Sequence, residues 1–200
     1  MSALSQLYQE IALCRRCDLY KTRTKAVPGE GPEDADIVFI GEAPGWHEDQ
    51  QGRPFVGPAG QYLNKLLDSI GLKREQVYIT NIVKSRPANN RDPLPAEITA
   101  CRPWLDKQIE LIKPKMIITL GRYSMALFFP GKGISKIHGK PQKKDGVIYY
   151  PMYHPAAALH QWSLRETIET DMKQIPRLLS EIEGLPEVQE EPPTQQLSMF

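Results

Sequence analysis

The sequence predicts an α/β fold in three layers (α/β/α), with a central, mostly parallel sheet between two layers of helices. Short apolar runs rich in β-branched residues alternate along the chain with longer segments whose apolar residues recur at helical spacing. Strands that are connected through helices pair in parallel, and helices then cover both faces of the sheet. The 200 residues, 40% of them hydrophobic, suffice for one domain with a sizeable core.

Four apolar runs have the length and composition of strands in this sheet: residues 37–40, 77–83, 116–120 and 147–153. Helices are predicted at residues 4–11, 58–70, 95–112 and 165–183. Pro95 suits the first turn of its helix, whereas we expect Pro176 to interrupt the last one.

Composition divides the chain into a folded domain, residues 1–182, and a flexible acidic, proline-rich tail, residues 183–200. The last 20 residues contain five Glu and no Lys or Arg, so the preceding residues carry 25 basic against 19 acidic side chains. A basic domain suits a nucleic-acid partner. Because no signal peptide, transmembrane run or lipidation motif is visible, we expect a cytoplasmic, nucleoid-associated monomer without membrane contact.

Three of the predicted strands end in polar side chains that can do chemistry. Glu42 follows the first strand within a Gly-Glu-Ala-Pro-Gly loop, Asn81 lies near the end of the second, and His154 follows the fourth. Ligands of open α/β sheets bind at the carboxyl ends of the strands. The amide of Asn81 carries a donor and an acceptor and can read a flat, amide-like edge. The pattern therefore predicts one pocket that contains a carboxylate, an amide and an imidazole.

The cysteines indicate a metal centre that lacks one ligand. Cys14 and Cys17 form a Cys-x-x-Cys pair, and Cys101 is the third cysteine of the chain. Zinc and cubane iron–sulfur clusters take four protein ligands. A redox pair is the alternative, but thioredoxin-type motifs follow a strand and open a helix, whereas this pair ends an N-terminal helix.

Five segments occur in the order of a known family: GEAPG at 41–45, GRPFVG at 52–57, TNIVK at 80–84, NNRDP at 89–93 and HPAAAL at 154–159. With them the chain resembles the family 4 uracil-DNA glycosylases, the iron–sulfur branch of the uracil-DNA glycosylase superfamily, from about Leu4 to about Ile182. The resemblance implies a uracil-DNA glycosylase-like fold. It also implies a hydrolase of N-glycosyl bonds that flips uracil out of single- or double-stranded DNA and initiates base excision repair.

The resemblance also implies a role for each residue of the predicted pocket. Phe55 would stack on uracil, Asn81 would pair with its O4 and N3–H, and His154 would donate to O2. Glu42 would orient or activate water. Glu48 would crowd C5, where thymine carries a methyl group, and Gly41 would let the backbone approach the base. Phe55 as a core residue, Glu42 as a helix cap and Glu48 as a surface charge are the alternatives.

The same resemblance implies a [4Fe–4S] cluster with Cys14, Cys17 and Cys101 among its ligands. Ser85 occupies the fourth position, where the family has cysteine. Serine keeps the shape of cysteine, which suggests an engineered substitution, with a natural variant as the alternative. A hydroxyl is a harder ligand with a higher pKa than a thiol, so the cluster is expected to be Ser-ligated, reduced to three irons or lost.

DNA contacts are expected beyond the pocket. In the resembling family the segment after His154 enters the minor groove, which implies that Leu159, Gln161 and Trp162 contact DNA. Lys136 and Lys140 belong to a lysine cluster around a Gly-rich loop that could meet phosphates. The cluster also includes Lys132, Lys143 and Lys144. A core tryptophan and a solvated hairpin are the alternatives.

The tail ends in Gln196-Leu197-Ser198-Met199-Phe200, which is similar to the bacterial sliding-clamp binding pentapeptide. Gln196, Leu197 and Phe200 would bind the clamp, and a chance apolar terminus is the alternative. For the whole chain the main competing function is an iron–sulfur or zinc protein that binds nucleic acid and senses redox state without glycosylase activity. A phosphate-binding loop at Gly41–Gly45 is excluded, because no Lys-Ser/Thr pair follows.

Overall fold

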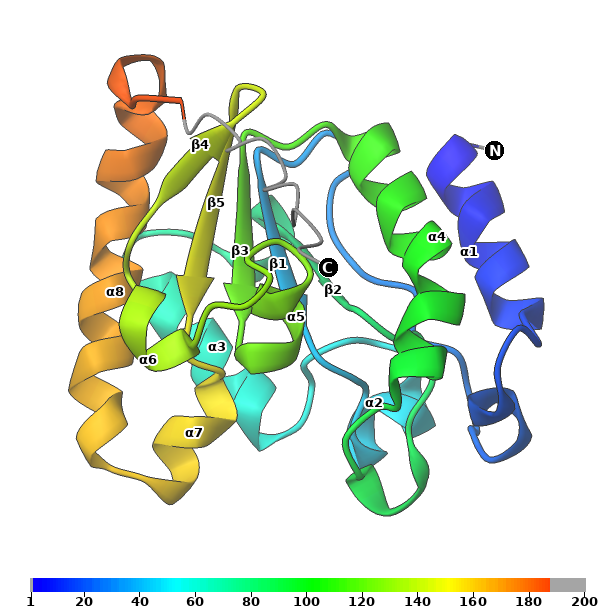
Figure 1. Ribbon diagram of the computed structural model, residues 1–200. Helices are drawn as coiled ribbons and strands as arrows, with labels where there is room; N and C mark the ends of the chain where they lie inside the picture. Colours follow the sequence, from blue (N-terminus) through cyan, green and yellow to red (C-terminus); the bar gives the residue numbers. More distant parts are fainter. Residues whose placement is uncertain (1, 188–200) are drawn as a thin grey trace, which may run out of the picture.

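The computed structural model describes residues 2–187 and contains a five-stranded sheet with helices on both faces (Figure 1). The strand order is β2-β1-β3-β5-β4. The strands are β1 (Ile37–Gly41), β2 (Tyr78–Asn81), β3 (Met116–Leu120), β4 (Gln142–Lys144) and β5 (Val147–Met152). All pairs are parallel except β4–β5, a hairpin that turns through Asp145 and Gly146. The predicted three-layer α/β class is confirmed. Strand β4 was not predicted as a strand, although a hairpin was the alternative for the lysines in this segment.

Two apolar clusters lie on the two faces of the sheet. On one face, α1 (Ala3–Leu13) and α4 (Pro95–Ile112) pack against the strands through residues such as Ile11 and Leu105. On the other face, α3 (Pro58–Ser69) and α8 (Ser163–Ser180) pack through residues such as Leu63 and Met172. These long helices are amphipathic, so burying their apolar stripes against the sheet drives the layered arrangement.

Short helices gather at the carboxyl ends of the parallel strands, below the arrowheads in Figure 1. They are α2 (Trp46–Gln51), α5 (Arg122–Ala126), α6 (Ile134–Ile137) and α7 (Pro155–His160). Residues 2–187 also contain four 3₁₀ turns: η1 (Asp18–Lys21), η2 (Arg74–Gln76), η3 (Ala88–Asn90) and η4 (Ile182–Gly184). The segments after Gly45 and His154 are therefore helical.

The last helix departs from its prediction. Helix α8 runs without interruption through Pro176, which is exposed on its solvent face. Only one intrahelical hydrogen bond is lost at a proline, and water can satisfy the freed carbonyl there. The apolar face of α8, which includes Ile168, Ile175 and Leu178, remains buried.

The first residues of the predicted tail contact the domain. Leu185 packs against the core, and the Glu187 carboxylate accepts from the backbone N–H of Gly146 at 3.2 Å. Within residues 2–187, no helix is long and apolar enough to span a membrane.

Candidate active site

The carboxyl ends of β1, β2 and β5 deliver the three predicted polar residues to one pocket. Gly41 and Asn81 are register partners at the ends of β1 and β2, so Glu42 emerges beside Asn81. His154 follows β5, and all three residues line a cavity of about 650 Å³ together with Phe55. The structure thus brings together in one cavity the side chains that the sequence predicts to share a site.

Asn81 presents an unused hydrogen-bond acceptor. Its side chain is buried, with 2% of the residue exposed, and the Oδ1 atom has no hydrogen-bond partner. A buried acceptor without a partner costs about 1–3 kcal/mol. A ligand that offers an N–H group would recover this free energy.

Gly41 leaves the space in which the Asn81 amide and the Phe55 ring lie. A Cβ atom at Gly41 would lie 2.5 Å from Asn81 Oδ1 and 2.5 Å from Phe55 Cζ. Gly41 is held by pairing with β2, so any larger residue would displace both side chains. Glycine is required at position 41 because the Asn81 and Phe55 side chains approach its Cα closely, and not because the backbone turns there.

Phe55 combines a strained backbone with a fixed ring. Its φ angle is +50°, which is uncommon for a residue with a side chain and indicates strain. The ring stacks on His154, with 5.5 Å between centroids and 27° between planes. Arg74 holds the segment by donating to the carbonyls of Phe55, at 3.0 Å, and Pro54. The ring is also part of the apolar core, as the alternative for Phe55 expected, while Phe55 also lines the pocket.

His154 is held as a neutral imidazole. Its Nδ1 accepts from the backbone N–H of Ala156 at 3.1 Å and caps α7. Burial lowers the pKa of His154 to about 4, although the charge of Glu48 opposes this shift. The proton of the neutral ring therefore lies on Nε2, which is left to donate into the pocket.

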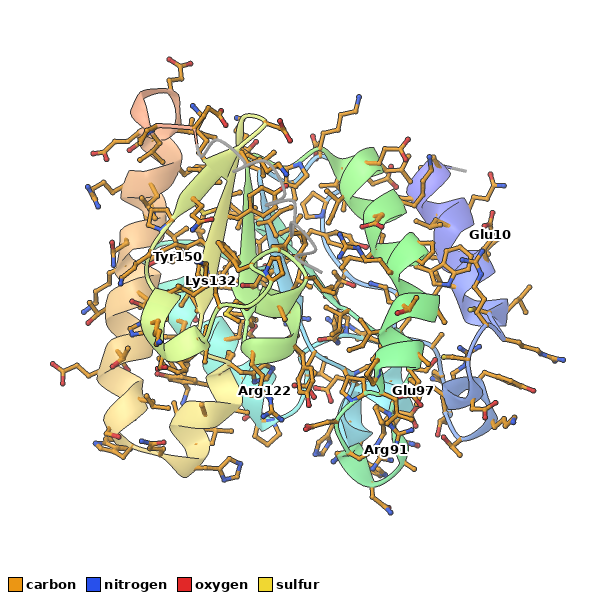
Figure 2. All side chains as sticks on the ribbon, viewed as in Figure 1. Glu10, Arg91, Glu97, Arg122, Lys132 and Tyr150 are labelled. Carbon is orange, nitrogen blue, oxygen red and sulfur yellow. The ribbon has the colours of Figure 1, made fainter. Side chains whose placement is uncertain are left out.

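Glu42 has an unusual proton affinity. Burial raises the pKa of Glu42 to about 7, and the carboxylate of Asp92 adds to the rise, while Arg122 opposes it. Arg122 itself forms an ion pair with Asp92 at 2.6 Å. Figure 2 shows Arg122 at the carboxyl end of the sheet. A carboxylate with a pKa near neutrality is suited to accept a proton.

Glu48 holds the wall of the pocket. Its Oε1 accepts from the backbone N–H groups of Val56 and Gly57, at 2.9 and 2.8 Å, and its Oε2 accepts from that of Gly45 at 3.1 Å. The carboxylate thus joins the start of α2 to the loop that carries Phe55. The alternative of a free surface charge is wrong.

The outer residues of the predicted DNA surface are exposed. Leu159 lines the mouth of the pocket, and Trp162 is 74% exposed, with Arg165 over its ring at 4.7 Å. The alternative of a core tryptophan at 162 is therefore wrong. Gln161 is exposed between them and donates to Ser163 Oγ at 3.1 Å.

The predicted lysine cluster is divided between two ends of the sheet. Lys136 and Lys140 are exposed in and after α6, and Lys140 Nζ donates to the Lys136 carbonyl at 2.8 Å. Lys143 lies in β4, on the way to the hairpin turn at the opposite end, and pairs with Glu187 at 3.7 Å.

The three cysteines and Ser85 line a second, smaller hollow between the end of α1, the segment after β2 and α4. Trp104 Nε1 donates to Cys14 Sγ at 3.2 Å, and the backbone N–H of Lys84 donates to Cys101 Sγ at 3.3 Å. The Ser85 hydroxyl accepts from Arg23 Nη1 at 2.9 Å. Burial raises the pKa values of Cys17 and Cys101. Among the described residues, no three His, Cys, Asp or Glu side chains are placed to bind a single ion.

Comparison with known proteins identifies the family. The model of the Uracil DNA glycosylase superfamily matches residues 28–176. The chain belongs to the uracil-DNA glycosylase superfamily. A type-4 uracil-DNA glycosylase of Sulfurisphaera tokodaii is 50% identical over 89% of this chain and 86% of the relative. One of Archaeoglobus fulgidus is 48% identical over 89% and 94%.

A further curated relative agrees with this family assignment, and a solved structure shares the fold. A type-5 uracil-DNA glycosylase of Pyrobaculum aerophilum is 30% identical over 78% of this chain and 76% of the relative. This chain is therefore more similar to the two type-4 proteins than to this type-5 protein. The solution structure of a putative uracil DNA glycosylase from Methanosarcina acetivorans has a TM-score of 0.50 at 13% identity. It covers 78% of this chain and 98% of its own, and it shares the fold.

Several residues of this glycosylase-family site gave no sequence signal. Arg74 is distant in sequence from Phe55, and Trp46 follows a glycine loop in a helix too short to show periodicity. Gly121, with φ +89°, allows the His154 Cβ to approach within 3.1 Å of where its own Cβ would lie. Lys84, the last residue of the TNIVK segment, lines the cysteine hollow and is buried. Its Nζ donates to Thr80, Asn81 and Gln108, and no sequence pattern indicated this network.

Proposed function

We propose that this protein is a uracil-DNA glycosylase that flips uracil out of DNA and hydrolyses its N-glycosyl bond, which initiates base excision repair. The observation that carries the proposal is the buried Oδ1 of Asn81, which lacks a partner in a pocket also lined by Glu42 and His154. The membership of the family supports it independently.

Asn81 would read the edge of the base. Its Oδ1 accepts from N3–H of uracil, and its Nδ2 donates to O4. Cytosine presents an acceptor at N3 and a donor at N4, which opposes both groups of Asn81. The free energy lost at the unpaired Oδ1 is then recovered with uracil and not with cytosine.

His154 would act on the departing base. As the bond between N1 and C1′ breaks, negative charge develops on the base oxygens. A neutral imidazole that donates from Nε2 to O2 binds this charge more strongly than it binds the ground state, which lowers the barrier. The hydrogen bond from Ala156 to Nδ1 supports this role, because it keeps the proton on Nε2.

Glu42 would serve the sugar side of the reaction. In its ionised form it orients a water molecule toward C1′, accepts its proton and stabilises the positive charge on the sugar. Its raised pKa near 7 makes the carboxylate a stronger base than an exposed glutamate.

Phe55, Glu48 and Gly41 would shape the space around the base. The Phe55 ring would stack on one face of uracil. Three backbone N–H groups fix the Glu48 carboxylate at the wall of the pocket, and we place this carboxylate against C5 of the base. A thymine methyl group would meet this wall. Gly41 would let the Asn81 amide and the Phe55 ring take the positions from which they contact the base.

A [4Fe–4S] cluster would take Cys14, Cys17 and Cys101 as three of its four ligands, with Ser85 at the fourth position. This assignment rests on the donor set and on two N–H groups that donate to thiol sulfurs, a pattern that also supports cluster ligands. A bound cluster would crosslink α1, the segment after β2 and α4 as a structural centre. The Ser85 hydroxyl, engaged by Arg23, is a weak ligand.

The surface around the pocket would contact DNA. We assign phosphate contacts to Lys136 and Lys140 and duplex contacts to Leu159, Gln161 and Trp162, all of which are exposed. A monomer that acts on single- or double-stranded DNA in the cytoplasm, near the nucleoid, is consistent with this arrangement.

The tail would bind a bacterial sliding clamp. Its predicted anchors, Gln196, Leu197 and Phe200, lie outside the described residues, so this proposal rests on the sequence of the pentapeptide. A tethered short peptide would raise the local concentration of the enzyme at DNA that carries a clamp.

The experiment that tests the function is single-turnover release of uracil from an oligonucleotide by the wild type and by Asn81→Ala, Glu42→Ala and His154→Ala. Each variant should lower the rate about 10-fold or more, the scale of one transition-state hydrogen bond or acid–base group. Wild-type rates in all three would contradict the proposal. A redox protein that binds DNA without cleaving it, the competing function, leaves the convergence of these three side chains unexplained.

A further inference from the structure

Trp46 is an exposed aromatic side chain at the mouth of the pocket that the reaction described above does not use. It is 53% exposed, whereas the structural Trp104 is 8% exposed. Trp46 lines the pocket at the first residue of α2. Its ring contacts that of His47, at 5.0 Å between centroids and 86° between planes. The contact is edge-on and leaves much of the indole in water.

The helix that carries Trp46 is rigidly held. Asp49, 1% exposed, accepts from the backbone N–H of Thr24 at 2.9 and 3.1 Å. Glu48 binds three backbone N–H groups, as described above. The exposure of Trp46 is therefore not a consequence of a loose segment. A large apolar ring presented to water on a fixed support is a binding feature rather than a packing residue.

The position of Trp46 relative to the pocket indicates its ligand. The pocket mouth is lined by α2 on one side and by Leu159 and His160 of α7 on the other, and both helices lie beyond the arrowheads of the sheet in Figure 1. A nucleotide that has entered the pocket remains bonded to its two neighbours, so the strand must cross this mouth. Flipping also removes one stacking partner from each neighbouring base.

We propose that Trp46 stacks on a base adjacent to the flipped uridine in the same strand and replaces the stacking contact that flipping removes. This inference rests on the proposed glycosylase function. Indole–base stacking tolerates every base, because each has a π face, so Trp46 adds affinity for the strand without adding sequence preference. The ring acts in binding and not in bond cleavage.

The test combines variants of Trp46 with single-stranded oligonucleotides that contain one uracil. Three substrates are needed: one with normal neighbours, one with an abasic tetrahydrofuran residue on the 5′ side of the uracil and one with it on the 3′ side. Single-turnover rates at increasing enzyme concentration separate the half-saturating concentration from the maximal rate. Leu94→Ala is the matched control, because Leu94 is also 53% exposed but does not line the pocket.

For the substrate with normal neighbours, Trp46→Ala should raise the half-saturating concentration about 10-fold, with the maximal rate nearly unchanged. Trp46→Phe should retain most of the affinity, and Leu94→Ala should behave as the wild type. On one of the two flank-modified substrates, the half-saturating concentration of the wild type should rise to the value that Trp46→Ala shows on the substrate with normal neighbours. The half-saturating concentration of Trp46→Ala should be the same on these two substrates. This non-additivity is the signature of direct contact.

Independent, additive losses on both flank-modified substrates would overturn the inference, as would wild-type affinity of Trp46→Ala. Circular dichroism of each variant checks that the fold is kept, and Trp46→Phe provides the test if the alanine variant is unstable. Absence of uracil release by the wild type from the unmodified substrate would instead refute the proposed function. The two failures are therefore distinguishable.

Discussion

The raised pKa of Glu42 predicts how the rate of uracil release depends on pH. In its role as the base that accepts a proton from water, Glu42 must be ionised. Because burial and Asp92 raise its pKa to about 7, the active form increases as pH rises through neutrality. His154 does not contribute in this range, because its pKa of about 4 keeps the imidazole neutral.

The magnitude follows from the ionised fraction. With a pKa of about 7, roughly one-tenth of Glu42 is ionised at pH 6 and roughly nine-tenths at pH 8, so the single-turnover rate should rise about 10-fold between them. An exposed glutamate, with a pKa of about 4.3, would give a flat profile over this range. Glu42→Gln should flatten the profile and lower its plateau.

Asp92 and Arg122 lie near Glu42 and shift its pKa in opposite directions, so neutralising each one gives a pair of matched variants. Asp92→Asn removes the negative charge that raises the pKa of Glu42, so the midpoint should move to lower pH. Arg122→Gln removes the positive charge that lowers it, so the midpoint should move to higher pH. Rates measured from pH 5 to 9 at constant ionic strength would reveal both shifts. A wild-type midpoint below about pH 5.5, or shifts in the same direction, would refute the electrostatic account of Glu42.

Three further predictions concern the glycine, the cluster position and the tail. Gly41→Ala should lower uracil release about 10-fold or more in single-turnover assays, because its Cβ would displace Asn81 and Phe55; an unaltered rate would exclude the close approach at Gly41. Ser85→Cys should increase iron content and visible absorbance, and identical iron content and spectra in air would show that Ser85 is not at a ligand position. Deletion of residues 196–200 should leave release from a short oligonucleotide unchanged but abolish clamp binding. No anisotropy change for the full-length chain at about tens of micromolar clamp would exclude the motif.

The long elements and the strand-end chemistry were predictable because they are encoded locally. Residues 95–112 and 116–120 were predicted with the bounds observed, since proline at the first turn and uninterrupted apolar runs mark them. The meeting of Glu42, Asn81 and His154 followed from a general property of parallel sheets, whose carboxyl ends form one edge.

The features that were missed depend on contacts between distant segments. Helix α2 has one turn and a half, and Glu48 stabilises it through backbone groups beyond Gly52 that no local pattern reveals. The hairpin strand β4 is short and polar, with every residue half-buried, so it lacks the alternation that marks a strand. Arg74 donates to the Phe55 carbonyl, although helix α3 and a turn separate the two residues in the sequence. The packing of α3 brings them together.

The central claim is that Asn81 selects uracil by its hydrogen-bonding edge, and base release from matched oligonucleotides tests it most directly. Oligonucleotides that differ only in one uracil, cytosine or thymine are incubated with the protein, and abasic sites are then cleaved with alkali. We predict cleavage at uracil alone, and a loss of about 10-fold or more in the rate at uracil for Asn81→Ala. Equal release of cytosine and uracil, or cleavage of none of the three substrates, would contradict the account.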